Sequence, residues 1–147
     1  MLVRCDIVEL MEYVVLSQRN PGQHDVFVAK HDYTPKAGTK FLGNTQHHYP
    51  KKNWSSLMLF NCGSPGSKKL TPEIVNTESG AYLHQMEWAD SVGELHKDWN
   101  HLVGEYEENP DAKIVHYTLG TPCFSGYENQ EYSAEWFQEQ EMMLHAD

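Results

Sequence analysis

Apolar residues recur at helical spacing near the start of the chain. Within residues 6–16, Ile7, Leu10, Met11 and Val14 fall on one helical face, and Asp6 stands before them where a helix cap belongs. The pattern therefore predicts a helix over this segment.

Further along, short apolar runs alternate with polar stretches. The runs at 25–30, 54–61, 92–95 and 113–119 predict strands. Thr71 and Pro72 are typical of a helix start, with the helix ending near Gly80 and a further helical turn over 81–85. The acidic segment 132–145 is amphipathic and predicts a surface helix.

The passage from His31 to Asn53 is polar and holds two prolines and two glycines. A connection of this length without regular structure is typical of a lid or a binding loop. No repeat or linker divides the chain, so we expect residues 1–147 to form one domain. Interleaved strands and helices without regular βαβ spacing indicate an α/β or α+β layer fold built on a mixed sheet.

Composition narrows the class of partner. The formal charge of −10 argues against binding to nucleic acid or to an anionic membrane surface. A mean hydropathy of −0.64 and the lack of a long apolar run exclude a transmembrane helix. Three cysteines far apart make no disulfide framework, so we expect a cytoplasmic protein.

The nine histidines do not form a common metal motif. There is no HExxH sequence, and the adjacent His47 and His48 would point to opposite faces of a strand. His116 differs, because an apolar strand carries it to a point just before Gly120. Two interpretations stay open: a core histidine with satisfied hydrogen bonds, or a metal ligand beside a glycine that lets phosphate oxygens approach the backbone.

Two lysine pairs are the main local concentrations of positive charge. Lys51-Lys52 and Lys68-Lys69 both lie in segments with turn character, where either pair could meet a diphosphate or simply be solvated. The tryptophans likewise either stack on sugar rings or fill the core. The residues alone do not single out a catalytic acid, base or nucleophile.

Three segments together resemble the nucleotide-diphospho-sugar transferases of the GT-A type, the glycogenin and lipopolysaccharide galactosyltransferase group. Residues 52–61 (KNWSSLMLFN) resemble the strand F-N-[AS]-G-V-x-[LV]-x-N of that group. Residues 95–100 (LHKDWN) resemble L-P-x-x-[WF]-N, and residues 114–122 (IVHYTLGTP) resemble the start of V-V-H-[FY]-x-G-x-x-K-P-W.

The resemblance implies roles for four residues. His116 would be a ligand of the catalytic Mn²⁺, Gly120 would contact the diphosphate through its backbone, and Ser55 and Ser56 would line the donor sugar pocket. The first ten residues, MLVRCDIVEL, match the segment immediately after the metal-binding Asp-x-Asp motif in that group. Mn²⁺ or Mg²⁺ is therefore expected only if a half carrying Asp-x-Asp is supplied, because one histidine cannot hold either ion.

Two hypotheses for function come from different classes. The first is the acceptor-side half of a GT-A glycosyltransferase, a partner of nucleotide sugars or carbohydrates and inactive alone. The alternative is a non-catalytic sugar-binding or structural module. Because half of a fold leaves an apolar face and a sheet edge uncovered, a homo-oligomer is expected. A histidine-based metal hydrolase ranks last.

Overall fold

The structure is a computed structural model that describes residues 1–17, 21–35, 38, 40–45 and 47–145. Its strands form two small sheets, each of three strands with mixed pairing. In one sheet β6 (Ile114–His116) lies between β1 (Leu2–Val3), which is antiparallel to it, and β5 (His101–Leu102), which is parallel. In the other, β2 (Val26–Ala29) lies between antiparallel β3 (Met58–Phe60) and parallel β4 (Val92–Leu95). The expected α/β class is confirmed, with two small mixed sheets in place of one.

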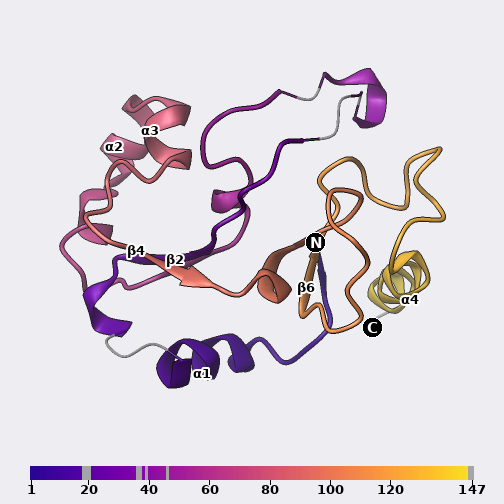
Figure 1. Ribbon diagram of the computed structural model, residues 1–147, viewed down its shortest axis with the longest axis horizontal. Coiled ribbons are helices and arrows are strands. Elements are labelled where there is room, and N and C mark those ends of the chain that lie inside the picture. Colours follow the sequence, from indigo (N-terminus) through magenta and orange to yellow (C-terminus); the bar gives the residue numbers. More distant parts are fainter. Residues whose placement is uncertain (18–20, 36–37, 39, 46, 146–147) are drawn as a thin grey trace.

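Four α-helices surround these sheets in the described part of the chain. They are α1 (Val8–Ser17), α2 (Pro72–Thr77), α3 (Gly80–His84) and α4 (Ser133–Leu144). Figure 1 shows α2 and α3 together at one end of the molecule, α4 at the opposite end and α1 along an edge between them. The N-terminus lies beside β6.

The helix starts follow from their capping residues. The Asp6 carboxylate accepts a hydrogen bond from the backbone N–H of Val8 at 2.9 Å. The Thr71 hydroxyl accepts one from Ile74 N–H at 3.3 Å, and Pro72 occupies the first turn. Both caps satisfy N–H groups that a helix leaves without partners, and both predicted helix starts are confirmed.

An apolar cluster connects the two sheets. Its buried members come from α1, β2, β4, β6 and the turn before β5; they are Leu10, Val14, Phe27, Ala29, Leu95, Trp99 and Ile114. All four residues of β2 are buried, which explains why that strand has no polar alternation. Trp88 and Trp99 are core residues, at 1% and 4% exposed, as expected of tryptophans that fill a core.

The segment 54–61 is a strand only over its last part. Trp54–Ser56 form a short 3-10 helix and pairing begins at Met58. The hydroxyl of Ser56 donates to the Asn53 carbonyl at 2.7 Å, which stabilises the turn that apolar content alone did not predict. Between His31 and Asn53, the described residues hold one regular element, the 3-10 helix Phe41–Gly43, in agreement with a long loop.

A buried carboxylate connects the loops at one end of β2. Asp25 is 5% exposed, and its side chain accepts hydrogen bonds from the backbone N–H groups of Gly66, Asp90 and Ser91 at 2.8–3.0 Å. Hydrogen bonding from Ser64 and these N–H groups lowers the pKa of Asp25, although burial opposes the shift. The loops after β3 and before β4 are thereby held to β2.

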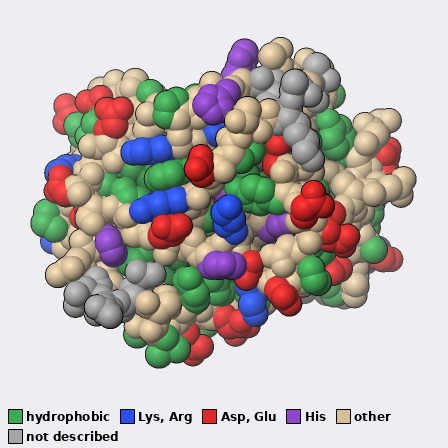
Figure 2. All heavy atoms as spheres, in the orientation of Figure 1, with side chains coloured by type: hydrophobic (Ala, Val, Ile, Leu, Met, Phe, Trp, Pro, Cys, Tyr) green, Lys and Arg blue, Asp and Glu red, His purple; other side chains and the backbone are tan. Residues whose placement is uncertain are grey.

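Charge is unevenly distributed over the surface. Figure 2 shows acidic side chains in several places on one face, with lysine or arginine side chains next to hydrophobic ones between the α2–α3 end and β2. Acidic side chains lie next to these basic ones in Figure 2, so both signs of charge meet on this part of the surface.

Candidate functional site

A buried asparagine connects two distant segments. The side-chain amide nitrogen of Asn100, 0% exposed, donates to the Ser56 hydroxyl at 2.8 Å and lies 3.3 Å from the Asn53 carbonyl. Asn100 comes after β4 in the turn that begins at Lys97, whereas Asn53 and Ser56 precede β3. Segments 52–61 and 95–100 therefore meet at one point.

Asn53 extends the contact to the third segment. Its side-chain amide donates to the Tyr33 hydroxyl at 2.7 Å and to the Thr118 hydroxyl at 3.3 Å. Its φ of 62° lies in the left-handed region, which asparagine adopts more readily than most residues. Segments 52–61, 95–100 and 114–122 thus share one hydrogen-bonded cluster.

His31 is the buried base of this cluster. Its Nε2 lies 3.0 Å from the Asn100 amide nitrogen, and its Nδ1 lies 2.8 Å from the Tyr106 hydroxyl. Because an amide nitrogen only donates, Nε2 accepts and Nδ1 carries the proton. Burial, then the charges of His116, Lys97 and His101, lower the pKa of His31 to about 4. The ring is therefore neutral at pH 7.

The tyrosines of the cluster are neutral too, because their hydroxyl groups keep their protons. Burial raises the pKa of Tyr106 to about 12 and also raises that of Tyr33. The rings of His31, Tyr33 and Tyr106 pack with centroids 5.6–6.3 Å apart. The cluster is thus a neutral, aromatic-lined network that positions Asn53 and the residues after it.

His116 ends β6 with a buried nitrogen that has no partner among the described residues. Its Nδ1 lacks a hydrogen bond in the structure, and burial, followed by the positive N-terminus and Lys40, lowers its pKa to about 4. A core histidine with both nitrogens satisfied does not describe this site. The β1–β6 register pairs Leu2 with Val115, so Met1 comes opposite His116.

The expected Mn²⁺ or Mg²⁺ site at His116 depends on which side chains nearby could bind the ion. Among the described residues there is no group of three or more His, Cys, Asp or Glu side chains that could hold a metal ion. His116 offers one neutral imidazole, while Mn²⁺ and Mg²⁺ need several oxygen ligands. The described residues therefore do not make a complete site for either ion.

The residues expected to bind the donor separate into different environments. Ser56 lies in the cluster, whereas the Ser55 hydroxyl points outward and lies 2.8 Å from Nδ1 of His84. Gly120 is buried, and a Cβ there would lie 3.0 Å from Cβ of Phe41 and 3.2 Å from the Tyr127 ring. Close packing by the protein's own side chains thus already accounts for a glycine at position 120.

Sequence reasoning missed the centre of the cluster. His31 stands out in the sequence only as a neighbour of Asp32, and Asn100 and Tyr106 carry no recognised role there. Asn100 meets His31 across 69 positions and Tyr106 meets it across 75, so no local spacing could reveal the arrangement. The one available signal was Asn100 itself, a polar residue directly after a core tryptophan.

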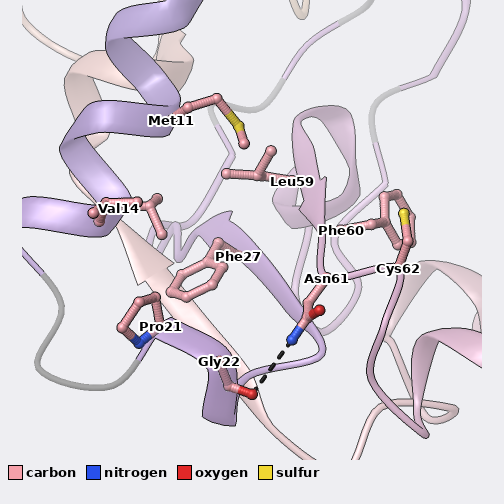
Figure 3. A pocket seen from close by; sticks show the side chains of 10 residues that line it. Met11, Val14, Pro21, Gly22, Phe27, Leu59, Phe60, Asn61 and Cys62 are labelled. Atoms are coloured by element: carbon pink, nitrogen blue, oxygen red, sulfur yellow. Dashed lines mark hydrogen bonds between the residues drawn. The ribbon is translucent and has the colours of Figure 1, made fainter.

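An apolar groove lies apart from the polar cluster. It measures about 380 Å³ and opens between α1 and the edge strand β3. In Figure 3, Met11 and Val14 of α1 face Phe27 of β2 and Leu59 of β3 across it. Asn61 closes one end through a hydrogen bond to the Gly22 carbonyl at 3.3 Å.

The chain is similar in sequence to a plant protein. It is 40% identical to Protein CDI of Arabidopsis thaliana over 148 aligned positions, which cover 96% of this chain and 57% of that protein. The chain thus spans just over half the length of this relative. No family model matches the chain, and no solved structure does. In the described residues, no helix has the length and apolar character needed to cross a bilayer.

Proposed function

We propose that this chain is the acceptor-side part of a GT-A type glycosyltransferase, which moves a sugar from a nucleotide-diphospho-sugar to an acceptor. The supporting observation is the meeting of three segments in one cluster. Asn100 donates to Ser56 and lies 3.3 Å from the Asn53 carbonyl, and Asn53 donates to Thr118. The segments that carry the resemblance therefore meet in space, as parts of one site would.

In this proposal a segment preceding Met1 completes the metal site. An antiparallel extension of β1 before Met1 would run alongside the residues that follow β6, starting next to His116. Aspartates of an Asp-x-Asp motif placed there would approach the unpartnered Nδ1 of His116. Mn²⁺ or Mg²⁺ enters only with such a segment, and the chain alone transfers no sugar.

The remaining roles belong to the same proposal. Ser55, Ser56 and the backbone of Gly120 would contact the donor. The greater length of Protein CDI supports a protein in which this chain is one part, although that name states no activity. The three cysteines, free in the structure, agree with a reducing compartment, and we place the protein in the cytoplasm.

The test begins with the codons upstream of Met1. If they encode an Asp-x-Asp strand in frame, the extended chain is purified and assayed with uridine- and guanosine-diphosphate sugars for Mn²⁺-dependent release of nucleoside diphosphate. We expect activity from the extended chain, none from the 147-residue chain, and a loss of at least about tenfold in the extended His116→Asn variant.

A matched control separates ligation from folding. His145 is an exposed histidine directly after α4, away from the polar cluster, and the extended His145→Asn variant should keep full activity. The absence of an upstream Asp-x-Asp strand, together with no binding of Mn²⁺ and a uridine-diphosphate sugar at millimolar concentration, would contradict the proposal.

A second candidate is a non-catalytic, self-associating module. The observation that favours it is the exposed apolar side of α1, where Met11 is 53%, Val15 64% and Leu16 84% exposed. This side adjoins the groove beside β3, an edge strand. Apolar surface next to an open edge is typical of a contact between chains, and a second copy would cover it.

A further inference from the structure

A second hollow, distinct from the apolar groove, is lined by lysines and aromatic rings. It measures about 620 Å³ and is formed by residues 30–33, residues 48–52, Trp54 and Glu94. It lies next to the polar cluster, because His31 and Tyr33 belong to both. We call this hollow the lysine cleft.

Cations and rings alternate within the lysine cleft. The ammonium groups of Lys30 and Lys51 lie 6.0 and 5.8 Å from the centre of the Trp54 ring, and that of Lys52 lies 5.4 Å from the Tyr49 ring. Each distance is within the range of cation–π attraction. Three of the chain's 11 basic side chains thus gather at one hollow of an acidic protein.

The positive charge of Lys52 lies in a largely buried position. The residue is only 4% exposed, and its ammonium donates to the His47 carbonyl. A carbonyl uses one of three N–H donors and brings no negative charge. Burial, then Lys40, lowers the pKa of Lys52. Because a buried cation costs free energy, an anion arriving at this ammonium would offset part of that cost.

The backbone holds Lys51 in an unfavourable conformation. Its φ is 54°, in the left-handed region that lysine rarely adopts, and the φ of nearby Asn53 is 62°. The ammonium of Lys51 donates to the Gln85 carbonyl at 2.6 Å, which fixes the position of the side chain. Strain of this kind persists where the surroundings determine it, and it is concentrated at binding sites.

Carboxylates also line the lysine cleft. Asp32 and Glu94 are among its lining residues. A simple anion would meet both signs of charge there, whereas a ligand that joins an acidic group to several hydroxyls suits the mixture. Carboxylates accept from hydroxyls, ammonium groups bind the acidic group, and aromatic faces cover the apolar side of a sugar ring.

We propose that the lysine cleft binds an anionic sugar, with its carboxylate or phosphate at Lys51 and Lys52 and its ring against Trp54 and Tyr49. The inference deepens the proposed function and rests on it only for the role of the sugar in transfer. In that role, the sugar that is transferred or the sugar that accepts it would be acidic. Binding itself requires neither a metal ion nor a further segment of chain.

The experiment is calorimetric titration of the 147-residue chain, without metal, with four probes. They are glucuronate, glucose 6-phosphate, glucose and inorganic phosphate. We expect glucuronate or glucose 6-phosphate to bind at least about tenfold more tightly than glucose and than inorganic phosphate, which corresponds to about 1.4 kcal/mol. Whichever acidic sugar binds more tightly identifies the anionic group as a carboxylate or a phosphate.

Two substitutions locate the binding. Lys51→Asn removes the charge with a residue that tolerates the left-handed backbone, and it should weaken the acidic sugar at least about fivefold. Lys68→Gln removes an exposed lysine outside the cleft and should leave the affinity unchanged. Lys52→Met, checked for folding by circular dichroism, should abolish the preference for the acidic sugar over glucose.

Four outcomes would overturn the inference. In the first two, glucose or inorganic phosphate binds as tightly as the acidic sugars. In the third, no probe binds at concentrations up to about 10 mM. In the fourth, Lys68→Gln weakens binding of the acidic sugar as much as Lys51→Asn does. Acidic-sugar binding by a chain whose gene lacks an upstream Asp-x-Asp strand would preserve this inference while contradicting transfer. Sugar transfer by an extended chain that does not distinguish acidic from neutral sugars would support the proposed function and contradict this inference.

Discussion

The side-chain amide of Asn100 donates to the hydroxyl of Ser56 at 2.8 Å, across 44 positions of sequence. Ser56 also contacts the turn before β3, because its own hydroxyl donates to the Asn53 carbonyl at 2.7 Å. One serine hydroxyl therefore joins the segment after β4 to the strained turn before β3. The adjacent Ser55, which faces outward, has no part in this chain of bonds.

Ser56→Ala should destabilise the protein by about 1–3 kcal/mol, because it leaves a buried donor and a buried acceptor without this partner. Ser55→Ala should change stability by no more than about 0.5 kcal/mol, since its hydroxyl contacts an exposed histidine. Urea denaturation followed by tryptophan fluorescence measures both. Equal effects of the two substitutions would contradict the placement of Ser56 at the centre of the cluster.

Local elements were largely predictable because their determinants are local. The cap at Thr71, the proline after it and the apolar run of β2 act within a few residues. The cluster around His31 was not predictable, since its partners come from 69 and 75 positions away and only the tertiary structure brings them together. Trp54–Ser56 resembled a strand because side-chain hydrogen bonds that stabilise a turn leave no trace in hydropathy.

Stability should fall as the pH is lowered from about 6.5 towards 4. His31 and His116 have folded-state pKa values of about 4, below the ordinary value of 6.5. In that window the unfolded chain binds protons that the folded chain excludes, so acid favours unfolding. Each histidine contributes up to about 1.4 kcal/mol per pH unit. The pKa of Asp25 lies below 3.8, so its contribution is lost only at lower pH.

Denaturation curves at several pH values between 4 and 7 check this dependence. His116→Asn should remove about half of the slope, because one of the two excluded protons disappears. His48→Asn, at an exposed position, should leave the slope as it is. A stability that stays level from pH 6.5 to 4.5 would show that both rings accept protons in the folded protein.

Gly120→Ala should destabilise the protein through steric overlap. The new methyl group would lie 3.0 Å from Cβ of Phe41 and 3.2 Å from the Tyr127 ring. Overpacking of this kind costs about 1–3 kcal/mol. Gly22→Ala is the control, because a Cβ there meets nothing within 4 Å. Comparable melting temperatures for the two variants would contradict the packing role; the contact of Gly120 with a donor stays a separate prediction.

If the exposed side of α1 joins two copies of the chain, a charge placed on it should separate them. Val15 is 64% exposed beside the groove that runs to β3, and Val15→Lys would put an ammonium into the apolar contact. Val75→Lys on α2, where the valine is 47% exposed, is the matched control. Sedimentation equilibrium should give a dimer or larger species for the wild type and for Val75→Lys, and a protomer for Val15→Lys.

Salt provides an independent check on the nature of that contact. Two copies that each carry a formal charge of −10 repel one another. Raising the salt concentration screens this repulsion, while burial of apolar surface is not weakened by screening. Association through α1 should therefore strengthen between low salt and about 0.5 M salt, whereas a contact held by ion pairs would weaken. A wild-type chain that sediments as one protomer at both concentrations would rule out the self-associating module.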